Sequence, residues 1–108
     1  MLNSFEMSLA VLCALAPRST GERVRCWVVG GWTAWQVLER LEPDEVADWL
    51  AAEEGELIVN QRRLATAVHT TLVELAAAGR VRRRASRYGV ELRSKGHRHA
   101  VVDVFRLA

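Results

Sequence analysis

Residues 60–81 read NQRRLATAVHTTLVELAAAGRV, and this stretch predicts a long amphipathic helix that leads into a strand. One face is apolar because its residues recur at three-four spacing, as Leu64, Val68, Leu72 and Leu75. We expect Asn60 to cap the helix start by accepting a backbone N–H bond. Gly79 should end it, because a residue without Cβ readily takes the left-handed conformation of a helix end. The predicted helix covers residues 60–78.

The opposite face of this helix is short, hydroxylated and cationic near its start. Its candidate DNA-contacting residues are Gln61, Arg62, Arg63, Thr66 and Thr70. Arg can bond guanine, Gln can bond adenine, and Thr suits a phosphate or a thymine methyl. Cations at a helix N-terminus oppose the helix dipole, which favours a role beyond solvation, although an ordinary solvated helix start is the alternative. His69, at the margin of the apolar face, is expected to pack rather than to contact a base.

A basic β-hairpin is predicted after the helix, over residues 80–107, with its returning strand at 101–107. Alternation along a strand places Arg82 and Arg84 on one face and Val81 on the other. The hairpin residues expected to contact DNA are Arg82, Arg84, Arg87, Arg93, Lys95 and Arg98. The last three lie near the tip and suit phosphates or a narrow minor groove. Arg80 has an alternative structural role, bonding the carbonyls of the helix end.

Charge is strongly segregated along the 108 residues, although the net charge is only +2. Residues 1–79 carry six Arg against eleven acidic residues, whereas residues 80–108 carry nine basic residues against two acidic ones. A chain with one positive end can steer toward a polyanion. A solvated basic tail is the alternative interpretation.

The N-terminal part predicts a first helix over residues 4–16, with Phe5, Leu9, Leu12 and Ala16 at helical spacing and Pro17 as its stop. Residues 18–32 look irregular, with a short strand over residues 24–29 that ends at Gly30-Gly31. A first helix this apolar also suggests self-association.

A second helix is expected at 33–41, because Thr33 and Gln36 match the capping box. Its apolar contacts should come from Trp35, Val37, Leu38 and Leu41. Pro43 begins a third helix over 43–53, whose inward residues should be Val46, Trp49 and Leu50. Residues 56–60 are either a short strand or an extended lead-in. The prediction is therefore a single α+β domain, mostly α, over residues 1–108.

Several function classes are not expected. The apolar run at 9–16 is too short for a membrane span, and no Lys or Arg precedes it as in a signal peptide. Cys13 and Cys26 lack metal-ligand spacing and are interpreted as reduced thiols of a cytoplasmic protein. His97 and His99 have no third ligand nearby. No catalytic constellation or phosphate loop is present in the pattern, so we expect no enzyme, cofactor or metal.

Three segments together resemble the winged helix-turn-helix family, with the MarR-like and PadR-like regulators as the nearest types. Thr33–Leu41 is similar to the positioning helix, Leu72–Val81 to the end of the recognition helix, and Val104–Leu107 to the returning wing strand. Residues 42–59 depart from the family pattern, because they insert an extra helix between the positioning helix and the recognition helix. The resemblance implies a small transcriptional regulator that binds double-stranded DNA, as a homodimer.

Two alternatives remain open at this stage. A winged helix can serve as a protein-binding adaptor, here through the acidic 42–56 segment and the tryptophans at 27, 32, 35 and 49, which otherwise pack in the core. Structured RNA is a third possibility, although Tyr88 is the only aromatic residue of the hairpin before its last strand.

Overall fold

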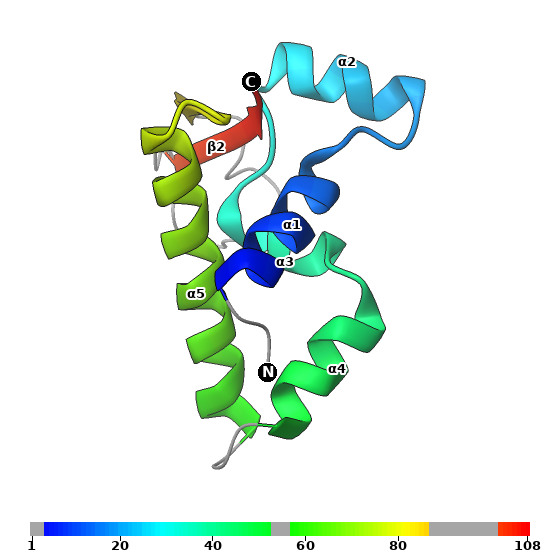
Figure 1. Ribbon diagram of the computed structural model, residues 1–108. Coiled ribbons are helices and arrows are strands. Elements are labelled where there is room, and N and C mark those ends of the chain that lie inside the picture. Colours follow the sequence, from blue (N-terminus) through cyan, green and yellow to red (C-terminus); the bar gives the residue numbers. More distant parts are fainter. Residues whose placement is uncertain (1–3, 53–56, 87–101) are drawn as a thin grey trace, which may run out of the picture.

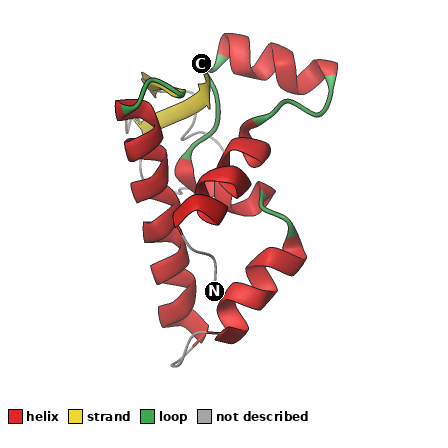
Figure 2. Ribbon diagram, in the orientation of Figure 1, coloured by secondary structure: helices red, strands yellow, loops and turns green. Residues whose placement is uncertain are grey.

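The long helix runs along one side of the molecule, and the hairpin lies at one end of it (Figure 1). A computed structural model describes residues 4–52, 57–86 and 102–108. In chain order its elements are α1 (Ser4–Leu15), α2 (Thr20–Val28), α3 (Ala34–Arg40), α4 (Pro43–Ala52), α5 (Leu57–Ala77), β1 (Val81–Ser86) and β2 (Val102–Leu107). Helices α1 and α3 pack on α5, and the hairpin lies at the C-terminal end of α5 (Figure 2). The expected α+β, mostly helical class is confirmed for the described residues.

The core is built around α5, as its pattern predicts. Leu64, Val68, Leu72 and Leu75 are all buried. They pack in one cluster with buried residues of α1, α3, α4 and the hairpin, including Val11, Val37, Trp49 and Phe105. Three-four spacing thus identified the buried face of this helix.

The C-terminal end of α5 also follows the prediction. Gly79 takes a left-handed φ of 77°. Its N–H donates to the Ala76 carbonyl at 3.1 Å, and the Arg80 N–H donates to the Leu75 carbonyl at 3.0 Å. Backbone groups therefore satisfy these helix-end carbonyls in a Schellman motif. The alternative role of the Arg80 side chain at these carbonyls is not needed.

The start of α5 was predicted wrongly. The helix begins at Leu57, so residues 57–60 are neither a strand nor an extended lead-in. Asn60 is not the cap but lies inside the helix, only 2% exposed. The physical reason is its position one turn before Leu64, which places it on the buried face. Residue 56, the first of the expected lead-in, lies outside the described residues.

Helix α1 has nearly the predicted bounds, but a different face is buried. Met7, Val11, Ala14 and Leu15 face the core, whereas Phe5 is 71% exposed. Leu9 is also exposed, and Leu12 and Ala16 are only partly buried. Nine of the twelve residues of this helix are apolar, so spacing alone does not distinguish its two faces. An apolar stripe is left on the outside of α1.

Residues 24–29 form no strand, because Thr20–Val28 is the helix α2. Ser19 is its N-cap, and its hydroxyl accepts the Glu22 N–H at 3.1 Å. The Glu22 carboxylate in turn accepts the Arg18 N–H at 2.7 Å. These bonds satisfy donors that a helix start leaves unpaired, and they outweigh the strand preference of the valines.

Helices α3 and α4 match their predicted positions. The Thr33 hydroxyl accepts the Gln36 N–H at 3.1 Å, and the Gln36 side chain accepts the Thr33 N–H at 3.0 Å, which confirms the capping box. Trp49 of α4 is buried, as expected. Trp35 of α3 is exposed, so its expected apolar contact is wrong.

The hairpin is antiparallel, and its register runs from Val81 opposite Leu107 to Ser86 opposite Val102. Trp32 adds a short bridge, because its N–H donates to the Phe105 carbonyl and its carbonyl accepts the Phe105 N–H, both at 2.8 Å. Gly31 permits this close approach, since a Cβ there would lie 2.1 Å from the Phe105 oxygen. The segment between α2 and α3 is thereby fastened to the hairpin.

Two general features bear on function. Cys13 and Cys26 are free thiols, as expected. Among residues 4–52, 57–86 and 102–108, the helices are too short or too polar to cross a membrane.

Candidate nucleic-acid interface

The predicted contact residues of α5 are all on the surface. Gln61, Arg62, Arg63, Thr66 and Thr70 are exposed, and Arg62, Thr66 and Thr70 lie opposite the buried apolar face. Arg62, Thr66 and Thr70 follow one another at intervals of four residues, so they form a line along the helix. Gln61 and Arg63 lie on either side of this line. Beyond Arg62 the side chains of this line are short, so another molecule can approach the helix closely.

His69 is exposed, and the edge of its ring lies against Phe105, with the ring centroids 6.4 Å apart and the planes at 88°. This edge-to-face arrangement is a favourable aromatic contact. The expected packing role of this histidine is therefore confirmed.

The hairpin presents three guanidinium groups on one face. Arg82 lies directly opposite Arg106, and Arg84 is two residues further along β1 on the same face. The Arg84 side chain passes over Gly30, since its Cδ lies 3.1 Å from where a Cβ of that glycine would be. Within the described residues none of the three forms an ion pair. Like charges directly opposite each other destabilise a strand pair, so this face gains from a bound anion.

The other face of the hairpin is neutralised. Arg83 donates from Nε to the Asp103 carboxylate at 2.9 Å, and its guanidinium lies 5.9 Å from the centre of the Phe105 ring. Arg83 is thus held by a partner, whereas Arg82 and Arg84 are exposed and have no ion-pair partner in the part of the chain that the structure describes. Strand β1 therefore carries one arginine that is paired with a carboxylate, Arg83, and two that can bind an external anion, Arg82 and Arg84.

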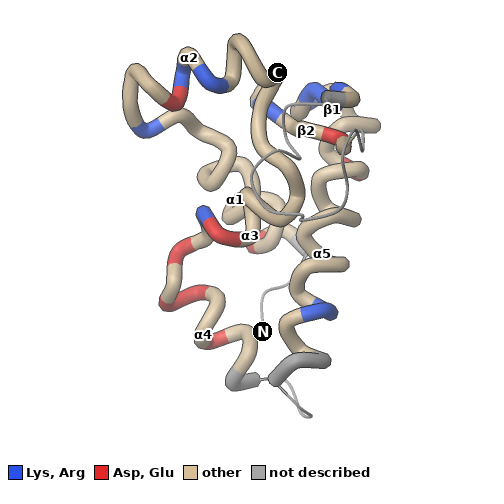
Figure 3. Tube along the Cα trace, turned by 180° about the vertical axis from the view of Figure 1, so that it is seen from behind, with Lys and Arg blue, Asp and Glu red and all other residues tan. Residues whose placement is uncertain are grey.

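Charge is unevenly distributed in space as well as in sequence (Figure 3). Cations gather on the hairpin and on α2 with the turn before it. Acidic residues gather on α3, on α4 and between them, as Glu39, Glu42, Asp44, Glu45 and Asp48. Helix α4 packs against α5. The hairpin end of the molecule is therefore the better approach for a polyanion.

Arg40 organises a polar cluster that sequence reasoning missed. Its Nε donates to the Ala14 carbonyl at 2.7 Å, and its Nη2 donates to the Ala16 carbonyl at 2.9 Å. Its Nη1 pairs with a Glu22 carboxylate oxygen at 2.8 Å, and its guanidinium lies 4.0 Å from the centre of the Trp32 ring. One side chain of α3 thus ties down α2 and the end of α1.

The same bonds set the charge state of Glu22. Hydrogen bonds from the Arg40 side chain and from the Arg18 N–H lower the pKa of Glu22 from 4.5 to about 2. The available sequence signal was Ser19-Thr-Gly-Glu22, which matches the same capping-box pattern as Thr33 to Gln36. Arg40 itself gave no local signal, because its partners are 18 to 26 residues away.

Arg25 and Cys26 of α2 lie on the inner side of that helix. The Arg25 guanidinium lies 4.8 Å from the centre of the Trp32 ring, and its buried Nε and Nη2 have no hydrogen-bond acceptor among the described residues. Burial raises the pKa of the Cys26 thiol, so this thiol stays protonated near neutral pH.

Four of the predicted contact residues, Arg87, Arg93, Lys95 and Arg98, lie outside the described residues, as do His97 and His99. In the part of the chain that the structure describes, no group of three His, Cys, Asp or Glu side chains is placed to hold a metal ion. Comparison with protein-family models, with curated proteins and with solved structures found no match.

Proposed function

We propose that this chain is a double-stranded DNA-binding protein of the winged helix-turn-helix type, used in transcriptional control or a related DNA transaction. In this proposal α3 is the positioning helix, α5 the recognition helix and the β1–β2 hairpin the wing. Two observations support it. The helices and the hairpin follow one another in the order that this type of domain requires. The bridge between Trp32 and Phe105 fastens the hairpin to the segment before α3.

The observation that carries the proposal is the cationic face formed by Arg82, Arg84 and Arg106. Three guanidinium groups that form no ion pair within the described residues, at the end of the molecule away from the acidic helix α4, are suited to phosphates of a backbone. Each phosphate neutralised by such a group releases counterions, which drives binding and makes it sensitive to salt. Phosphate contacts of this kind position a protein without reading sequence.

Sequence readout is assigned to α5. Arg62, Thr66 and Thr70 form the exposed line that enters the major groove in this proposal. The acidic helix α4 packs beside α5. In this proposal the DNA backbone therefore passes on the side of α5 that is turned away from the α4 carboxylates. The wing then supplies most of the attraction, and the helix supplies the discrimination between sequences.

The test is fluorescence anisotropy of a labelled DNA duplex over a salt series. We expect wild-type protein to bind, and the double variant R82A/R84A to reduce the slope of log affinity against log salt by about two. R83A is the matched control, because it removes a guanidinium from the same strand that already has Asp103 as partner. This control should change the slope of log affinity against log salt by less than about one from the wild-type value.

Two results would contradict the proposal. One is an absence of duplex binding by the wild-type protein even near 50 mM salt, where electrostatic binding is strong. The other is equal loss of binding in R83A and in R82A/R84A, which would mean that the two faces of the hairpin are not different.

A protein-binding adaptor is the second candidate, and exposed tryptophans favour it. Trp27 and Trp35 are both largely exposed, which is unusual for so large an apolar side chain. Trp49, in the acidic segment predicted as the interface, is buried instead. The surface of such an adaptor would therefore involve α2 and α3 rather than α4. Intact folding without DNA binding at low salt would favour this function over the first.

A further inference from the structure

Helix α2 has its polarity reversed. Its inner side carries charged groups, with Glu22 paired to Arg40 and Arg25 stacked over Trp32. Its outer side carries Val24, Trp27 and Val28, which are 53%, 82% and 61% exposed. Spacings of three and four residues place these three side chains in one stripe. Apolar stripes of this kind on a soluble protein mark interaction sites, and tryptophan is a frequent anchor in them.

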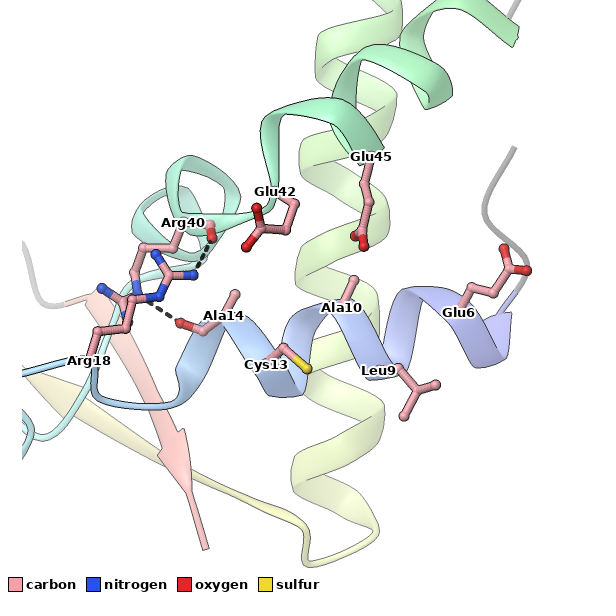
Figure 4. A pocket seen from close by; sticks show the side chains of 9 residues that line it. All are labelled: Glu6, Leu9, Ala10, Cys13, Ala14, Arg18, Arg40, Glu42 and Glu45. Atoms are coloured by element: carbon pink, nitrogen blue, oxygen red, sulfur yellow. Dashed lines mark hydrogen bonds between the residues drawn. The ribbon is translucent and has the colours of Figure 1, made fainter.

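The same chain contains a groove that is complementary to this stripe. The groove lies between α1 and the start of α4, with a volume of about 530 Å³ (Figure 4). Leu9, Ala10, Cys13 and Ala14 of α1 provide its apolar floor. Its rim is acidic, and Figure 4 shows the carboxylates of Glu42 and Glu45 directed from the α4 side toward α1, with Glu6 at one end and Arg18 and Arg40 at the other.

The stripe on α2 and the groove between α1 and α4 are complementary in charge and similar in length. Arg23 is exposed and precedes Trp27 by four residues, so a cation flanks the apolar stripe. No ion pair of Glu42 or Glu45 is present among the described residues, so both are available to such a cation. The floor from Leu9 to Ala14 extends about 7.5 Å along α1, and the stripe from Val24 to Val28 extends about 6 Å, at 1.5 Å per residue.

The positions of the two surfaces suggest how they meet. Helix α2 and the first turns of α4 extend to the same side of α1, away from α5 (Figures 1 and 3). A two-fold axis on that side would bring α2 of each copy to the groove of the other. Both contacts are then identical, and the assembly closes as a dimer without free sites.

We infer that the partner of the α2 stripe is a second copy of this chain: α2 of each copy docks in the α1–α4 groove of the other, with Trp27 as anchor and Arg23 facing Glu42 and Glu45. This assignment uses surfaces other than the cationic face of the hairpin, and it does not depend on the proposed DNA binding.

The test is sedimentation velocity of the full chain at increasing concentration, up to about 100 µM. We expect a monomer–dimer equilibrium. Trp27→Ser should raise the dimer dissociation constant at least about 30-fold, the effect of losing a hot-spot residue. Trp35→Ser is the matched control, since this tryptophan is exposed outside the stripe, and it should leave the dissociation constant within about threefold of wild type. Circular dichroism checks that each variant is folded.

A groove variant distinguishes docking in the groove from pairing of two α2 helices. Cys13→Arg changes an exposed residue of the groove floor and should weaken the dimer as strongly as Trp27→Ser. Charge exchange gives a further check that does not rely on loss of binding. Arg23→Glu and Glu45→Arg should each raise the dissociation constant about fivefold, and together they should restore it.

Three outcomes would overturn the inference. The first is a wild-type chain that remains monomeric throughout the concentration series. The second is a dimer that Trp27→Ser leaves unchanged. The third is a dimer that Trp27→Ser disrupts but Cys13→Arg and Glu45→Arg do not, which would mean that α2 pairs with itself.

Discussion

Helices α2 and α5 follow opposite rules. In α5 the apolar residues face the core and most polar ones face solvent, as in most helices on the surface of a domain, with Asn60 and Thr71 as buried exceptions. In α2 Glu22 and Arg25 face the rest of the molecule, and two valines and a tryptophan face solvent. The difference teaches that the attachment of α5 is hydrophobic, whereas that of α2 depends on a few polar contacts with Arg40 and Trp32.

The largest effect should come from removing a side chain of the α5 core. Leu72→Ala deletes a fully buried side chain, so it should lower the free energy of unfolding by about 3–5 kcal/mol. Trp27→Ala on α2 removes more atoms but should change the free energy by less than about 0.5 kcal/mol, because the ring is exposed. Denaturant unfolding of dilute protein measures both. Similar losses for the two variants would show that α2 is not a solvent-facing helix.

An intermediate effect is expected at the attachment of α2. Arg40→Ala leaves the Glu22 carboxylate and the Ala14 and Ala16 carbonyls without this donor, which should cost about 2–3 kcal/mol. Arg23→Ala, on the exposed side of the same helix, is the control and should cost less than about 0.5 kcal/mol. Amide exchange in α2 should accelerate in the first variant only. Unchanged exchange there would mean that Arg40 does not hold this helix.

The smallest effect should be the response of α2 to acid. The pKa of Glu22 is lowered to about 2 by its bonds to Arg40 and Arg18, so its ionised form stabilises the folded state. That contribution is complete above the unfolded pKa of about 4.5 and is lost as the pH falls from there through about 2. A Glu22 carboxyl that titrates near 4.5 in a pH series of NMR spectra would contradict this. The variant Glu22→Gln should lack this pH dependence of stability.

The contrast between the two helices also shows what the sequence could predict. Leu64, Val68 and Leu72 repeat at helical spacing and face the core, so their pattern was sufficient to predict the buried face of α5. Gly79 and the Thr33 capping box are local signals, and both were confirmed. Such features depend only on residues a few positions apart.

Helix α2 was missed because its apolar residues do not mark a buried face. Val24 to Val29 alternate loosely with polar residues, which favours a strand when only burial is considered. What holds the helix is Arg40, whose bonds to Glu22 and to the end of α1 appear only after folding. The candidate site shows the same limit, since the opposition of Arg82 and Arg106 depends on the register of the hairpin.

The most direct test of the proposed function is an NMR titration of the isotope-labelled chain with a DNA duplex. We expect the largest amide shifts in the hairpin around Arg82, Arg84 and Arg106, with a second group around Arg62, Thr66 and Thr70 on α5. Helix α2 and the groove between α1 and α4 should shift little. The absence of shifts, or shifts confined to α2 and that groove, would contradict DNA binding by the hairpin and α5.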